Sequence, residues 1–266
     1  MMAAPATSPR LAARTGTALL MFAVLALIGT ATGYADPNVL WNIVHGKCVP
    51  NELQNGKPDP CAAVDLRGGE QAGYAVLKDL VGATQFLLIP TARITGIESP
   101  LLLAPDVPNY FAFAWEARSY IDNALHRTMP RDDISLAVNS VSGRTQDQLH
   151  IHIDCVRADV RDALRKNGGT IRDKWAPFPV PLGGHRYIAM SVEGEQLGQA
   201  NPFKLLAEGW PIAKADMADQ TLVVVGGTFS DGRAGFFILD DRADPAKADK
   251  GSGEDLQDHN CAVAGL

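Results

Sequence analysis

The sequence predicts an α+β fold for the part of the chain that follows residue 35. From Thr145 to Cys155 apolar and polar residues alternate, and this period of two is typical of a β-strand. Residues 86–89 are continuously apolar, which predicts a second strand in the middle of a sheet. From about Asn109 to Leu125 the apolar residues recur at helical spacing instead, so a long amphipathic helix accompanies the strands.

The alternating strand holds an unusual set of polar side chains. Gln148, His150, His152 and Asp154 share one face, with about 7 Å from each to the next because a strand rises roughly 3.3 Å per residue. Three interpretations are open. The two histidines could bind a metal ion, they could be a nucleophile and its supporting acid or base, or the face could be a polar surface exposed to solvent.

The remaining elements are predicted from the same periodicities. Residues 243–254, rich in Asp, Lys, Ala and Gly, predict a solvated loop. The other expected elements are short helices at Asn38–His45, Ala158–Lys166 and Pro202–Gly209, and strands at Tyr74–Leu77, Gln85–Ile89, Asp133–Asn139, Arg186–Val192, Thr221–Val225 and Ala234–Leu239.

Two stretches of the C-terminal half are similar to the strand pair around the histidines. Residues 221–224, a Gly-rich loop and 236–241 repeat the order of 135–138, a loop and 150–155. With a constant offset, Ile238 takes the position of His152. This likeness suggests a second copy of the same unit that lacks the chemistry, and a chance similarity between two β-rich halves is the alternative.

The N-terminal 35 residues have the layout of a targeting segment. Arg10 and Arg14 precede an apolar run and small residues, with a possible cleavage site after Ala35. An uncleaved anchor in the inner membrane, with the body in the periplasm, and secretion to the periplasm after cleavage are both compatible with this pattern. Residues 36–266 would form the domain. The net charge of −6 for the whole chain and the lack of a Lys/Arg-rich run argue against nucleic-acid binding.

The four cysteines fit an oxidising compartment. They allow three pairings, of which we favour Cys48–Cys61, closing a short polar loop, and Cys155–Cys261, tying the C-terminus to the histidine strand. No Cys-x-x-Cys spacing is present, which argues against a zinc site.

The strand at 133–139, the Ser/Gly loop and the histidine strand together resemble the core of the histidine triad superfamily of nucleotide hydrolases and transferases. That family reads Gln-x-x-x-His-x-His-x-His, and here Gln146 begins the motif while Asp154 replaces the third histidine. Its upstream Asn falls on Asn139. Blocks 41–45, 85–98 and 146–153 further resemble the bacterial CDP-diacylglycerol pyrophosphatase family, a likeness that covers most of residues 38–266 and is weak from about 157 to 254.

This resemblance implies an antiparallel sheet with the long helix packed on one face, a catalytic half at 36–156 and an accessory half at 157–266. It implies hydrolysis of CDP-diacylglycerol to CMP and phosphatidate at the membrane surface, without a cofactor or metal. His152 would be the nucleophile and His150 would orient it. Candidate substrate-binding residues are Asn139, Gln146, Gln148, Asp154 and Arg93, with Lys78 and Arg144 as further cations.

Two other functions stay open at this point. One is a soluble periplasmic hydrolase or nucleotidyltransferase acting on water-soluble nucleotide conjugates. The other is a non-enzymatic metal or lipid carrier that uses His150 and His152. His126 is expected to cap a helix. His259 could approach the site if Cys261 bonds to Cys155, or else lie at the surface.

Overall fold

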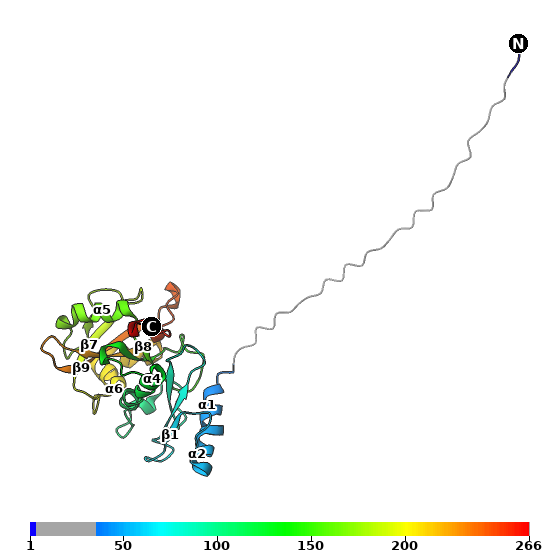
Figure 1. Cartoon of the computed structure of the whole chain (residues 1–266). Helices are drawn as coiled ribbons and strands as arrows, with labels where there is room; N and C mark the ends of the chain where they lie inside the picture. Colours follow the sequence, from blue (N-terminus) through cyan, green and yellow to red (C-terminus); the bar gives the residue numbers. More distant parts are fainter. Residues whose placement is uncertain (4–35, 266) are drawn as a thin grey trace. The chain divides into compact units, whose positions relative to one another are not determined.

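The computed structural model describes residues 1–3 and 36–265 (Figure 1). The chain divides into two units, at Met1–Tyr34 and Ala35–Leu266, and only the second is described at length. The predicted targeting segment therefore lies almost wholly outside the described residues. Among the helices that the structure describes, none is both long enough and apolar enough to cross a bilayer.

The second unit is built on one nine-stranded sheet in the order β1-β2-β3-β5-β4-β8-β9-β7-β6, in which all neighbours are antiparallel. An α+β fold with a large antiparallel sheet is thus confirmed. The strands are β1 Ala63–Asp65, β2 Tyr74–Lys78, β3 Phe86–Pro90, β4 Ile134–Val138, β5 Ile151–Cys155, β6 Ala176–Pro177, β7 Ile188–Glu193, β8 Gln220–Thr228 and β9 Ala234–Arg242.

Two halves of this sheet have the same chain order. In each half a strand pair is followed by two helices and then by an adjacent strand pair, and the halves meet where β4 pairs with β8. The second half contains α6 (Pro202–Gly209) and α7 (Pro211–Ala215), and α6 begins and ends where the sequence predicted. A repeated topology is therefore present.

The predicted equivalence of His152 and Ile238 is wrong. Cross-strand pairing runs from His152 through Ala137 and Val223 to Leu239, and directly opposed residues share a face of a sheet. Ile238 lies on the other face, because a shift of one residue reverses the side of a strand side chain. Leu239 is thus the β9 residue in the same cross-strand row and on the same face as His152.

The predicted single helix at 109–125 is two helices, α3 (Tyr110–Glu116) and α4 (Ser119–Leu125). They are separated by a tighter turn, in which the Arg118 amide donates to the Trp115 carbonyl and its guanidinium donates to the same oxygen at 2.6 Å. Phe111, Trp115 and Ile121 are fully buried against the sheet, so the aromatic residues belong to the core as expected.

At the start of the unit, α1 (Val39–Ile43), a π-helical turn (Val44–Cys48) and α2 (Val49–Asn55) form one longer helical segment than predicted. Its buried residues pack on the β2 and β3 residues of the sheet face opposite the aromatic helices. Cys48 is bonded to Cys61, and the other disulfide joins Cys155 to Cys261, the pairing favoured from the sequence.

The predicted histidine strand is shorter than the alternating pattern, because β5 begins only at Ile151. All five of its residues are buried, including the polar ones, so the polar face is not exposed to solvent. A C-terminal segment, residues 251–261, covers that face. It is held by the disulfide, by the Asp258 amide donating to the Cys155 carbonyl, and by a bridge between Val156 and Gln257.

The same segment corrects the predicted loop at 243–254. Residues 244–250 are mostly exposed, but Gly251 and Gly253 are buried. A Cβ atom at Gly253 would lie 3.0 Å from side-chain atoms of both Ala137 and Val223, so glycine allows this backbone to approach the sheet closely. A short 3₁₀ turn at Gly253–Leu256 follows, and α5 (Ala158–Asn167) lies where the sequence predicted it.

Candidate active site

The two histidines of the motif lie side by side at the start of β5. Their rings are 4.8 Å apart between centroids and meet edge to face. Only 8 % of His150 and 5 % of His152 is exposed. β5 is an inner strand of the sheet, between β3 and β4, so the backbone that carries the imidazoles is held on both sides.

The two imidazoles have different hydrogen-bond partners. His150 Nδ1 lies 2.7 Å from the Gln148 carbonyl oxygen, which fixes a proton on that nitrogen. His152 Nδ1 lies 2.7 Å from the Gln85 amide nitrogen and 3.3 Å from Glu254 Oε2. Its Nε2 is buried and has no hydrogen-bond partner within the described part of the chain. Of the two rings, His152 is therefore the one whose Nε2 is both fully buried and without a partner among the described residues.

Both rings are electrically neutral in this environment. Burial lowers the pKa of His150, and burial together with the neighbouring imidazoles of His150 and His259 lowers the pKa of His152 to about 3. The Gln85 amide nitrogen donates to Nδ1 in this arrangement, so the ring proton of neutral His152 is on Nε2; when that proton moves to Nδ1, toward Glu254, the lone pair on Nε2 becomes available as a nucleophile.

Glu254 is the acidic partner of His152 and is itself fixed by amides. Its Oε1 accepts from Asn139 at 2.8 Å and its Oε2 accepts from Gln85 at 3.0 Å. The carbonyl oxygen of the Asn139 side chain accepts from the Gly253 amide at 2.8 Å. Burial acts to raise the pKa of Glu254, but the His152 imidazole and the two amide donors lower it overall, which favours the carboxylate.

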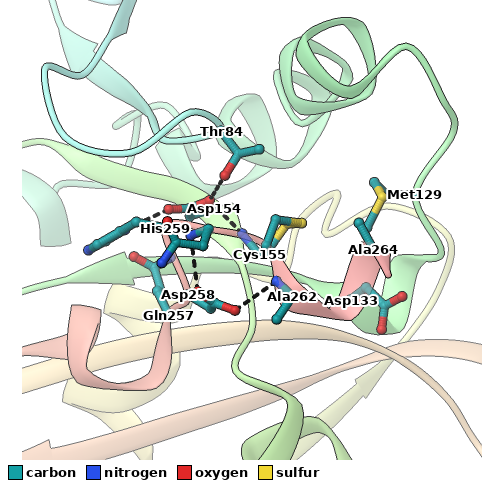
Figure 2. The surroundings of a disulfide bond; sticks show 12 residues. Thr84, Met129, Asp133, Asp154, Cys155, Gln257, Asp258, His259, Ala262 and Ala264 are labelled. Atoms are coloured by element: carbon teal, nitrogen blue, oxygen red, sulfur yellow. Dashed lines mark hydrogen bonds and ion pairs between the residues drawn. A yellow bond between two sulfur atoms is a disulfide. The ribbon is translucent and has the colours of Figure 1, made fainter. Parts of the chain in front are cut away.

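Asp154 occupies the position of the third histidine of the motif and points to a different partner. It is fully buried and accepts hydrogen bonds from Thr84 at 2.6 Å and from the Cys155 amide at 2.8 Å. Its second oxygen lies 2.7 Å from His259 Nδ1 (Figure 2). The carboxylate of Asp154 is thus directed at His259, a histidine of the C-terminal segment. Asp154 is not among the groups that shift the pKa of His152.

A scan of family models matches residues 35–265 to one described as CDP-diacylglycerol pyrophosphatase. The chain belongs to the CDP-diacylglycerol pyrophosphatase family. The resemblance found in the sequence is confirmed, and the family places this chain among hydrolases that act on CDP-diacylglycerol.

The other candidate residues of this pyrophosphatase lie around the imidazoles or beside α1. Gln148 is buried and donates to the carbonyls of Pro90 and Ala92, each at 2.9 Å. Gln146 accepts from the Leu40 amide and donates to the Asp36 carbonyl. Arg93 donates to Asn38 at 2.6 Å and stacks over the Trp41 ring.

Arg144 lines a small depression together with His150, Asn139 and Gln148. Its guanidinium bonds both oxygens of Glu98 and also contacts Asp147. Lys78 donates to the carbonyls of Asp79 and Gly82, in the turn that faces His259.

The sequence analysis missed Gln85 and Glu254 as site residues. In the sequence, Gln85 only marks the start of a predicted strand and of the block at 85–98. Glu254 ends a segment that is predicted to be solvated. Glu254 is 115 residues from Asn139 along the chain, so no local spacing connects them. The available signal was the predicted disulfide at Cys261, which brings the C-terminal segment to the histidine strand.

A group with the composition of a metal site lies in the second half. Side-chain atoms of His185, Asp241 and Asp249 are all within 4.8 Å of one another. In the described structure His185 Nδ1 already pairs with Asp249 at 2.7 Å. These residues are not among those that surround His152.

Proposed function

We propose that this pyrophosphatase cleaves CDP-diacylglycerol to CMP and phosphatidate through a cytidylyl group carried on Nε2 of His152. The observation that supports this most is the buried, neutral imidazole of His152, whose Nε2 has no partner among the described residues. A ring proton moved to Nδ1, 3.3 Å from Glu254 Oε2, leaves a nucleophilic lone pair on Nε2 at the opposite side of the ring.

The chemistry explains why an imidazole suits this bond. The negative charges of a pyrophosphate repel an incoming nucleophile, so an enzyme must provide a neutral one and stabilise the phosphoryl oxygens. A neutral imidazole meets the first need, and its adduct with phosphorus is itself readily hydrolysed. One difficult displacement is thereby divided into two easier ones.

The same proposal includes the fold and the cellular location. We infer a histidine triad-like unit in the first half, and in the second half a duplicate without its histidines, from the repeated chain order of strands and helices. The two disulfides indicate an oxidising, periplasmic type of environment.

Leu80 and Val81, exposed at the turn beside His259, suit an enzyme that meets a lipid surface.

The adduct is the direct test. Detergent-solubilised full-length protein is mixed with CDP-diacylglycerol, quenched within a turnover and digested, and the peptides are weighed by mass spectrometry. We expect a cytidylyl group on the peptide that contains His152, formed equally with and without EDTA because the nucleophile is an imidazole. Rapid turnover with no adduct at any time, or an adduct on His150, would contradict the assignment. Cleavage of water-soluble CDP conjugates but not of the lipid would transfer the proposal to soluble substrates.

The orienting role of Glu254 gives a separate prediction. Glu254→Gln removes the negative charge that favours a proton on Nδ1 of His152 and replaces one acceptor oxygen with a donor, so we expect kcat to fall by about 10²-fold or more with little change in KM. Glu208→Gln is the matched control, because Glu208 is exposed on α6. An unchanged kcat in the Glu254 variant, at an unchanged melting temperature, would rule this role out.

A further inference from the structure

His259 is a third histidine, which the structure brings to the face of β5 that carries His150 and His152. His152 and Asp154 are two residues apart on the same strand, so their side chains lie on one face about 7 Å apart. His259 Nδ1 lies 2.7 Å from Asp154 Oδ2 (Figure 2), and its charge is near enough to act on the pKa of His152. Its ring therefore lies on the same side of the sheet as the proposed nucleophile, at the next polar position of the strand.

The position of His259 is fixed from several sides. Its backbone carbonyl accepts from the Ala83 amide at 3.3 Å, in the turn that leads to Gln85. A Cβ atom at Gly82 would come within 2.7 Å of His259, so only glycine allows this close packing. The disulfide at Cys261 ties the segment to β5 two residues later. The backbone of His259 is therefore held in place by a hydrogen bond, close packing and a disulfide, unlike that of a histidine in a free surface loop.

The ring is fixed by one nitrogen and open at the other. Asp154, itself held by Thr84 and the Cys155 amide, binds Nδ1, whereas about 30 % of the His259 side chain is exposed. Figure 2 shows the second ring nitrogen directed away from the carboxylate. A carboxylate on Nδ1 and an accessible Nε2 is the arrangement of a histidine that exchanges protons with a substrate.

We propose that His259, held by Asp154, is a catalytic acid and base of this enzyme: it protonates the departing phosphatidate and then deprotonates the water that releases CMP. The proposal rests on the proposed role of His152. In the first step, the N–P bond to His152 forms, the P–O bond of the anhydride breaks, and the phosphatidate oxygen leaves with the electron pair and takes the proton from His259 Nε2.

The second step restores both histidines. Water attacks phosphorus, the P–N bond breaks, and its electron pair returns to Nε2 of His152. His259, now neutral, takes the proton released by the water. One proton thus passes from His259 to phosphatidate and is replaced from water, so no other reactant is needed.

The charges around His259 agree with this role. The hydrogen bond to Asp154 raises the pKa of His259 above its ordinary value, although partial burial opposes it. The carboxylates of Glu254 and Asp79 also favour the charged ring, and the His152 imidazole and the nearby Lys78 ammonium are the other titratable groups on this side. The ring is charged below this pKa, so the first step should slow as the pH rises through it.

The test compares two leaving groups in full-length protein. One substrate is CDP-diacylglycerol, and the other is a CMP ester of a strongly acidic phenol, which departs without a proton. We expect His259→Asn to lower kcat on the lipid by about 10²- to 10⁴-fold and to abolish the alkaline decline of the pH profile. The initial burst of phenol should survive, because it needs only His152. His126→Asn, at an exposed left-handed helix cap, is the matched control.

A second variant separates proton transfer from structure. Asp154→Asn keeps an acceptor for Thr84 but removes the charge opposite His259, so the alkaline decline should move to lower pH. Equal losses on both substrates with an unaltered pH profile would reduce His259 to a structural residue, as would a lipid rate no lower than that of the control. A phenol burst that persists in His152→Ala would instead overturn the proposed nucleophile. Circular dichroism and melting curves verify that each variant is folded.

Discussion

Replacing His152 by alanine will lower kcat for CDP-diacylglycerol by on the order of 10⁴-fold or more. The reason is that His152 combines a neutral ring with a fully buried Nε2 that has no partner among the described residues, at the nucleophile position of the motif. We expect that His150 does not substitute, since its side chain begins one pleat away from the position of His152. The measurement is release of CMP by the purified full-length variant in detergent.

The comparison with His150→Ala decides the assignment. This variant should lose less kcat, because His150 packs against the nucleophile rather than attacking phosphorus. If His150→Ala is inactive and His152→Ala is not, the nucleophile is one pleat earlier on the strand. His126→Ala should retain the parent rate, and melting curves should show that all three variants are folded.

Removing the disulfide between Cys155 and Cys261 is expected to have the second largest effect. The paired change of both residues to serine should lower the free energy of unfolding by about 2–5 kcal/mol, since the bond closes a long loop of chain. Activity should fall as well, even well below the melting temperature, because Glu254, Gln257 and His259 all lie in the segment that this bond retains against β5.

The other disulfide provides the matched control. Cys48–Cys61 closes a sequence separation of only 13 residues and joins the π-helical turn, which packs on β2 and β3, to the loop before β1. Its double-serine variant should also be less stable but should keep its kcat while it remains folded. Equal loss of activity in the two variants would count against a catalytic role for the C-terminal segment. A thermal transition unmoved by reductant would count against both bonds.

Much of the site's first half could be predicted from local sequence. The alternation around Ile151 and Ile153 predicts a strand that aims His150 and His152 the same way, and the short motif from Gln146 to Asp154 suggests the family. Spacing within a strand determines side-chain direction directly, so these residues needed no knowledge of the fold. The helix at 109–125 was predicted less well, because one apolar stripe does not reveal the tight turn at Arg118.

The two copies of the repeat cannot be aligned with one constant offset. A constant offset gave Ile238 as the counterpart of His152, whereas the pairing of β4, β8 and β9 gives Leu239. The offset between two hairpins depends on the loop that joins their strands, and one extra residue reverses the face.

The sequence by itself determined the α+β class, the histidine strand, the disulfide pairing that we favoured and the family. Only the tertiary structure decided what surrounds the imidazoles. Glu254 and His259 reach them from the end of the chain, and Asp154 binds His259 rather than the motif histidines. Such contacts join segments more than a hundred residues apart. They depend on how the C-terminal segment packs over the sheet, which no local periodicity encodes.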